Sequence, residues 1–232
     1  MNAKRTASLL ILAEVLANVA FTALGSIFNY PDVLDEPAGQ VLASFREHEG
    51  AVSAWFTVLA LSAALLAPIA IGVGRLSSAR AMRIAVPVGI AAATVQVIGL
   101  LRWPILVPGY AADAANGSAG ARDAFTTASD ILGTALGETL GYLLTATWTT
   151  LVIVALGRRY AGRWFVVLGA ASAGLVLAGV LSPLSLPVID TANFLGYVLW
   201  SVWLIAFAVV ILVHERRAAA APATPSRAAV TS

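Results

Sequence analysis

The sequence has no cysteine, only two histidines and few charged residues, which make up 11% of its 232 positions. The lack of cysteine excludes disulfides, thiolate nucleophiles, iron–sulfur clusters and cysteine-ligated zinc. His48 and His214 are predicted below to lie near opposite ends of a membrane, so we expect neither a bis-histidine haem nor a histidine-rich metal site. The sequence also lacks a nucleotide-binding loop, a serine nucleophile elbow and a zinc motif. We therefore expect no metal, no cofactor and, since topology explains the arginine clusters, no nucleic-acid partner.

Apolar residues dominate instead, at 59% of the chain with a mean hydropathy of +0.87, which indicates an integral membrane protein. Crossing a hydrocarbon core takes about 20 helical residues, and lipid requires helices because backbone polar groups must pair. Six stretches are long enough: residues 7–28, 51–74, 84–108, 131–157, 164–188 and 193–214. The sequence thus predicts an all-α, polytopic bundle of six transmembrane helices. It forms one domain, residues 1–214, followed by a disordered cytoplasmic tail, residues 215–232.

Basic residues set the orientation. On one side of the six-helix arrangement lie Lys4, Arg5, Arg75, Arg80, Arg83, Arg158, Arg159, Arg163, Arg216, Arg217 and Arg227. The opposite loops hold only Arg46 and Arg122. The positive-inside rule therefore predicts that both termini of this multi-pass protein are cytoplasmic, and we expect membrane lipids to surround its helices. A cleaved signal peptide is the alternative for the first stretch, but Glu14, Asn18 and its length argue against it.

Two outer loops give different expectations. In "EPAGQVLASF", Val41, Leu42 and Phe45 recur on one face after Pro37, which predicts a short amphipathic helix on the outer surface. Residues 109–130 are rich in small and turn-forming residues, which predicts a mobile loop before the fourth helix.

An internal repeat links the second half of the chain to itself. "LGYLLTATW" at residues 140–148 matches "LGYVLWSVW" at 195–203, and the preceding helices share a P-x-x-x-P ending at 104–108 and 183–187. We therefore interpret helices three and four as a hairpin that is repeated, with divergence, as helices five and six. Such repeats frame binding sites in transporters, while an old duplication of a packing unit is an equally good explanation.

The fourth helix carries a polar stripe beside a row of glycines. The stripe contains Thr134, Glu138, Tyr142, Thr145 and Thr149, and the row contains Gly133, Gly137 and Gly141. Small residues at this spacing let a neighbouring helix approach closely, so we expect this helix to be central. The sixth helix repeats the stripe in a milder form with Asn193, Tyr197, Trp200 and Ser201.

Arg102 and Glu138 are opposite charges at matching depth. Arg102 precedes Pro108 by about 9 Å and Glu138 follows Ile131 by about 10 Å, from a rise of about 1.5 Å per residue. An ion pair between them would relieve the cost of a charge in lipid. The alternative is that the long side chain of Arg102 extends to the outer headgroups.

Glu14 is the second buried acid, with Asn18 one turn above it and no cation near its depth. It could move a proton or donate one to a substrate, or it could hydrogen-bond a neighbouring helix. Gln96, Thr145 and Asn18 all fall near the middle of the membrane, so a closed polar knot is the simpler alternative.

Tryptophans complete the set of candidates. Trp148, Trp200 and Trp203 lie deeper than an interfacial belt, where they either fill the core or line a hydrophobic cavity. Catalytic residues are not assigned. The candidates for an intramembrane polar or ligand-binding pocket are Arg102, Glu138, Tyr142, Asn193, Tyr197, Glu14, Asn18, Gln96, Trp103 and Trp200.

Four ordered motifs carry a resemblance to a known family: "NYPDVLDEPAGQVLASF", "GLLRWPILVP", "GETLGYLLTATWT" and "NFLGYVLWSVWLI". Together they resemble bacterial membrane proteins grouped as domain of unknown function 4386, over roughly residues 7–213. The resemblance implies a six-helix bacterial membrane protein and supplies no activity.

Three functions fit these observations. The first is a non-enzymatic protein in which helices one, three, four and six enclose a polar pocket that binds or moves a small or lipidic molecule. The second is an intramembrane enzyme acting on a lipid or isoprenoid, with Glu138 or Glu14 as general acid or base. The third is a structural subunit whose polar residues only hold helices together.

Overall fold

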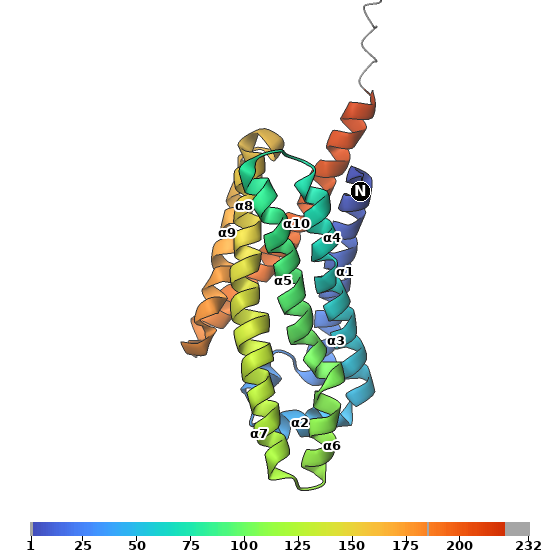
Figure 1. The fold of residues 1–232 in the computed structure, drawn as a ribbon, viewed down its shortest axis with the longest axis vertical. Coiled ribbons are helices and arrows are strands. Elements are labelled where there is room, and N and C mark those ends of the chain that lie inside the picture. Colours follow the sequence, from blue (N-terminus) through green and yellow to red (C-terminus); the bar gives the residue numbers. More distant parts are fainter. Residues whose placement is uncertain (1, 185, 221–232) are drawn as a thin grey trace, which may run out of the picture.

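A computed structural model describes residues 2–184 and 186–220, and these form helices without a β-strand. Six of the helical segments are long and apolar enough to cross a membrane, which confirms the six-helix prediction. They stand side by side as an elongated bundle (Figure 1).

The six spans are built from straight and interrupted helices. The first is α1 (Ala3–Phe28), and the second joins α3 (Glu49–Ala64) to α4 (Leu66–Gly74). The third joins α5 (Arg80–Ile105) to α6 (Val107–Ala115). The fourth consists of α7 (Ala119–Ala128), the π-helix η2 (Ser129–Leu140) and α8 (Gly141–Ala161). The fifth is α9 (Arg163–Ala178) with the 3-10 helix η3 (Gly179–Leu184), and the sixth is α10 (Pro187–Ala220).

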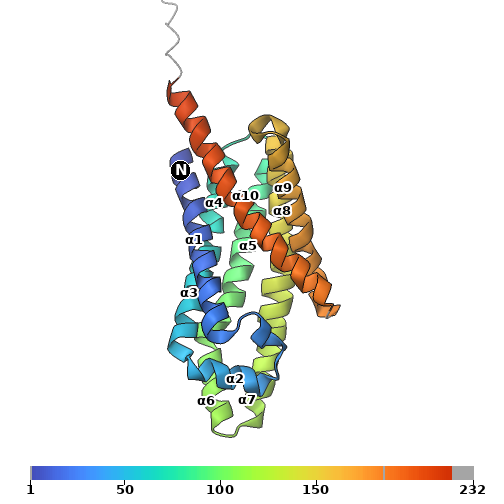
Figure 2. The ribbon, with the colours of Figure 1, turned by 180° about the vertical axis from the view of Figure 1, so that it is seen from behind.

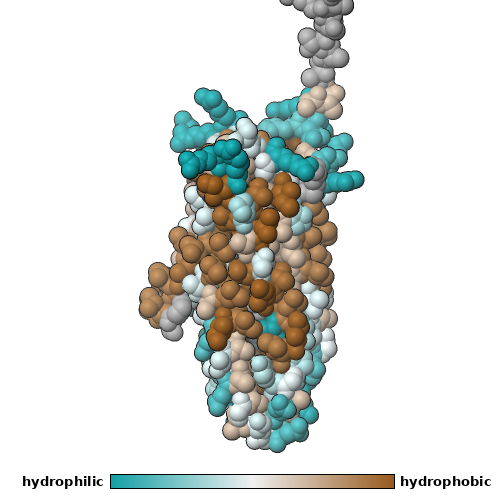
Figure 3. Space-filling model, viewed as in Figure 1, coloured by the Kyte–Doolittle hydropathy of each residue, from teal (hydrophilic) through white to brown (hydrophobic). Residues whose placement is uncertain are grey.

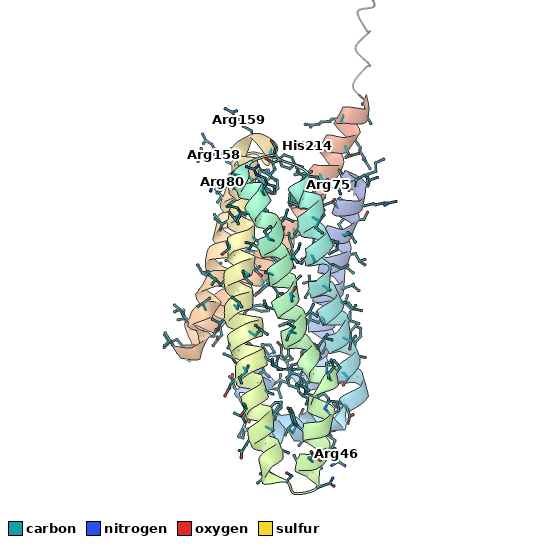
Figure 4. The ribbon with its side chains drawn as sticks, in the orientation of Figure 1. Arg46, Arg75, Arg80, Arg158, Arg159 and His214 are labelled. Carbon is teal, nitrogen blue, oxygen red and sulfur yellow. The ribbon has the colours of Figure 1, made fainter. Side chains whose placement is uncertain are left out.

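The two ends of the bundle differ in charge. Figure 4 shows Arg75, Arg80, Arg158 and Arg159 at the end where α1 begins, which we call the basic end, and Arg46 at the opposite end. The opposite end holds α2, α6 and α7 with exposed acids, and we call it the acidic end. Hydrophobic side chains form a band between the two ends (Figure 3). The cytoplasmic location of the basic end remains a prediction.

The amphipathic helix is present at the acidic end as α2 (Ala38–Glu47), preceded by the 3-10 turn η1 (Asp32–Asp35). Its predicted apolar face, Val41, Leu42 and Phe45, is buried. The structure thus confirms both the helix and the prediction that its apolar face is the buried one, which packs against the bundle.

The prediction of a loop before the fourth helix over residues 109–130 is wrong, because most of these residues are helical. α6 continues the third span, α7 leads into η2, and the chain turns between them at Gly117, whose φ is +85°. Ala111 and Phe125 are buried, so apolar contacts hold the two helices together where the composition alone indicated a loop.

The fifth span is also shorter than predicted. It was expected to run to residue 188, but α10 already begins at Pro187. Pro183 and Pro187 therefore lie on opposite sides of a turn, whereas Pro104 and Pro108 belong to one span. At the other end α10 runs to Ala220, so the first residues of the expected tail are helical, and residues 221–232 lie outside the described residues.

α10 crosses the bundle obliquely. It packs on α9 along its length and on α1, and Figure 2 shows it leading from beside α1 at the basic end toward α9 at its other end. The α9–α10 hairpin thereby leans away from α1 in the half of the molecule that faces the acidic end.

Candidate functional site

The buried apolar side chains form two separate cores. The basic-end core includes Leu10, Ile69, Trp148 and Phe207. The acidic-end core is rich in aromatic rings, with Trp103 stacked on Phe56 at 4.7 Å between centroids. Among the described residues, α9, η3 and α10 contribute no side chain to the buried acidic-end core.

Polar residues lie between the two cores on three spans. Glu14 and Asn18 fall between Ala13 of one core and Leu24 of the other. On the third span the residues between the cores include Gln96 and Arg102, and on the fourth they include Glu138, Tyr142 and Thr145. We call this set, with Asn193 and Tyr197 of α10, the polar layer.

Arg102 is buried, with 7% of its surface exposed, so it does not extend to the headgroups. Its Nη1 donates to the carbonyl oxygen of Gly99 at 2.6 Å, and its Cζ lies 5.3 Å from the ring centroid of Trp103. The guanidinium also rests on Gly133, where a Cβ would come within 2.8 Å of Cζ. The positive charge is thus held by a backbone carbonyl and an aromatic face.

Arg102 and Glu138 interact electrostatically, but the described residues include no direct ion pair between them. The predicted charge pairing is therefore present as a longer-range attraction only. Arg102 Nε and Trp103 Nε1 are buried without a hydrogen-bond partner in the described chain. Unsatisfied buried donors are unusual and call for an explanation.

Glu138 lies within electrostatic range of three tyrosines as well as Arg102: Tyr30, Tyr142 and Tyr197. We call these five residues the Glu138 cluster. Within the described residues the Glu138 carboxylate has no hydrogen-bond partner, and its side chain is only half-buried. The rings of Tyr142 and Tyr197 pack edge to face, with 5.7 Å between their centroids.

Tyr30 was not predicted from the sequence. It follows α1, outside the membrane-spanning helix, and its ring packs on Phe21 at 5.4 Å and on Phe56 at 5.2 Å. Burial is the main cause that raises the pKa of Tyr30 to about 12, with Glu138 adding to it. A tyrosine near the end of a membrane span is typical of an interfacial anchor, so its position alone did not indicate a role at Glu138.

Glu138 lies on the π-helix η2. Helices with i→i+5 hydrogen bonds are rare, and they frequently occur at functional sites. The glycine row predicted on this span allows the close approach that was expected. A Cβ at Gly99 of α5 would lie 2.8 Å from the Cα of Gly137, and Gly141 lies against Gln96. The third and fourth spans therefore meet backbone to backbone beside the Glu138 cluster.

Glu14 belongs to a different group. Ser201 Oγ donates to the Glu14 carboxylate, and Asn18 Nδ2 donates to Ser201 Oγ at 3.1 Å. These bonds tie α1 to α10, with Ser201 replacing the cation that the sequence did not provide. Glu14 therefore has a local partner, in contrast to Glu138.

The other candidates act as ties between helices. Gln96 Nε2 donates to Thr145 Oγ1 at 2.9 Å, and Trp200 Nε1 donates to Thr149 Oγ1 at 2.8 Å. Asn193 Nδ2 donates to the carbonyl oxygen of Val176 at 2.9 Å. The polar knot of the sequence analysis is thus several separate hydrogen bonds along the bundle.

Equivalent positions of the internal repeat meet in the structure. Tyr142 contacts Tyr197, and Trp148 contacts Trp203 with 6.2 Å between ring centroids. The repeat itself remains a prediction.

Two of the open hollows on the surface of the described residues are large, and neither of these is lined by Glu138. One of about 640 Å³ lies between α2, α6 and α7, and one of about 350 Å³ lies beside the start of α1. Among residues 2–184 and 186–220, no three His, Asp or Glu side chains are grouped to hold a metal ion.

Comparison with known families decides which group the chain falls into. The family model described as domain of unknown function DUF4386 matches residues 6–208. The chain belongs to this family. No curated protein and no solved structure matches it. DUF4386 membership thus agrees with the resemblance carried by the four sequence motifs, and it assigns no activity to the Glu138 cluster.

Proposed function

We propose that this DUF4386 member is a membrane-embedded binding protein of the bacterial cytoplasmic membrane that takes a small or lipidic molecule at the Glu138 cluster. The observation that carries the proposal is a carboxylate at membrane depth that has no hydrogen-bond partner in the described chain and lies within electrostatic range of three tyrosines and a buried arginine. Ionisable groups inside a membrane are costly, and they mark functional sites by default.

The contrast with Glu14 supports this assignment. Both acids lie within membrane-spanning helices, but the Glu14 carboxylate accepts from Ser201 and links two helices. A group whose role is to hold helices together is expected to be satisfied in this way. Glu138, Arg102 Nε and Trp103 Nε1 have no hydrogen-bond partner in the described chain, so each of them can still form a hydrogen bond with a ligand.

The chemistry of the cluster indicates a neutral polar group on the ligand. Arg102 and Glu138 carry opposite charges and interact with each other, so the site has no net charge to attract an ion. The carboxylate would accept a hydrogen bond from a hydroxyl or amide, and tyrosine hydroxyls can donate or accept. An amphipathic molecule with such a group, lying in the bilayer with its apolar part among lipids, satisfies these conditions.

Native mass spectrometry of the gently solubilised full chain tests the proposal. We expect wild type to carry a bound molecule that Glu138→Gln loses, because a hydrogen bond to a charged group contributes about 1.5–3 kcal/mol, or roughly tenfold or more in affinity. Glu14→Gln is the matched control, since it neutralises a membrane-embedded glutamate with its own partner, and it should retain the molecule.

Three results would contradict the proposal: a wild-type protein that carries no molecule, an adduct that Glu138→Gln retains, or equal loss of the adduct in both glutamine variants. Equal loss would mean that a disturbed helix bundle, and not the chemistry of Glu138, releases the molecule. Tyr142→Phe serves as a second variant, because it keeps the ring that packs on Tyr197 and removes only the hydroxyl.

A further inference from the structure

The hollow at the acidic end is distinct from the Glu138 cluster and is large enough for a small molecule. It lies between α2, α6 and α7 and has a volume of about 640 Å³, within the range of roughly 300–1,000 Å³ typical of small-molecule sites. Small apolar side chains form much of its wall, including Leu42 and Ala43 of α2 and Ala111 and Ala114 of α6.

Both basic residues of the acidic-end loops line this hollow. Arg46 comes from α2 and Arg122 from α7, so the fold brings together two side chains that are distant in the sequence. The surrounding loops and their edges are acidic, with Asp32, Asp35, Glu36, Glu47, Glu49, Asp113 and Asp123. Two arginines gathered at one hollow therefore form a local positive site on a negative face.

Within the described chain, neither guanidinium forms an ion pair or a hydrogen bond. Arg46 and Arg122 take part in no ion pair and donate no side-chain hydrogen bond to another described residue, although carboxylates are plentiful at this end. Arg122 lies over Gly39, where a Cβ would come within 3.4 Å of its Nε. The glycine thus leaves room for this side chain at the wall of the hollow.

We propose that the hollow binds a small organic monoanion, with its carboxylate between Arg46 and Arg122 and its apolar body on the alanines. Guanidinium groups match the two oxygens of a carboxylate in geometry and charge. Glu47 also lines the hollow, and its charge disfavours a multiply charged anion such as a phosphate ester. This site is independent of the Glu138 cluster, because it lies on α2, α6 and α7.

Fluorine NMR of the full chain in nanodiscs of zwitterionic lipid tests this inference with 4-fluorobenzoate as the probe. We expect saturable binding that weakens at least tenfold in Arg46→Gln and in Arg122→Gln. Arg163→Gln changes an exposed arginine at the other end of the bundle and should bind as wild type does. Glu138→Gln should also leave this binding unchanged, which separates the outcome from that of the proposed function.

Three results would overturn the inference. One is binding that does not saturate, and another is equal binding by the two arginine variants and wild type. The third concerns the chemistry: equal or tighter binding of 4-fluorobenzyl alcohol or 4-fluorophenyl phosphate would show that a single negative charge is not what the hollow recognises.

Discussion

The contact between α5 and η2 yields a quantitative prediction for Gly99→Ala. A Cβ at this position would lie 2.8 Å from the Cα of Gly137 and 2.9 Å from the carbonyl oxygen of Leu132. Ordinary van der Waals contact begins at 3.4 Å, and both neighbours are backbone atoms, so the two helices must move apart. A side-chain rotation cannot relieve this overlap.

The expected cost follows from two opposing effects. Overpacking costs about 1–3 kcal/mol, and the overlap of two backbone segments at Gly99 places the cost in the upper part of this range, at about 2–3 kcal/mol. Replacing glycine by alanine inside a helix offsets about 1 kcal/mol of it. The net loss of about 1–2 kcal/mol corresponds to a melting temperature about 2–8 °C lower for a chain of this size.

Intrinsic tryptophan fluorescence of the detergent-solubilised protein, followed during heating, measures this change. Gly174→Ala is the matched control, because Gly174 lies inside α9 and no atom lies within 4 Å of its would-be Cβ. We expect this control to melt at or slightly above the wild-type temperature. A Gly99→Ala protein that melts as high as wild type would refute the close approach of α5 and η2.

Two further predictions concern single polar groups. Trp200 Nε1 donates a hydrogen bond to Thr149 Oγ1, so a double-mutant cycle of thermal unfolding with Trp200→Phe and Thr149→Val should give a coupling of about 0.5–1.5 kcal/mol. Additive stability losses in the double variant would contradict this bond. Because burial raises the pKa of Tyr30 to about 12, its contribution to stability is complete below pH 10 and is lost as the pH rises toward 12. Tyr30→Phe should therefore lose less melting temperature than wild type between pH 10 and 12, and parallel curves would rule this out.

The positions of the helices and the faces that they bury were predictable from the sequence. Length and hydropathy gave the six spans, because the bilayer sets both requirements. The spacing of Val41, Leu42 and Phe45 gave α2 and its buried face. The row from Gly133 to Gly141 indicated the close approach to the third span, since small residues have few other reasons to recur at that interval.

Contacts between helices and local distortions were harder to predict. Depth matching paired Arg102 with Glu138, but depth says nothing about azimuth, and Arg102 is instead held by Gly99 and Trp103. Ser201 was visible as a polar residue, and only the oblique path of α10 places it on Glu14. The π-helix has no sequence signature in its periodicity, and the helices α6 and α7 depend on burial that composition does not report.

The division into two cores has a consequence for motion. The buried acidic-end core takes no side chain from the described part of the α9–α10 hairpin. That half of the hairpin is joined to the bundle by η3, which packs on η2, and by Tyr142, whose ring packs on Tyr197 and lies within 2.6 Å of a Cβ placed at Gly179. Outward tilting of this half would therefore separate these contacts without opening the buried acidic-end core. Tyr142 thus contacts the hairpin through Tyr197 and also lies within electrostatic range of Glu138, so a tilt of the hairpin would change the surroundings of that carboxylate.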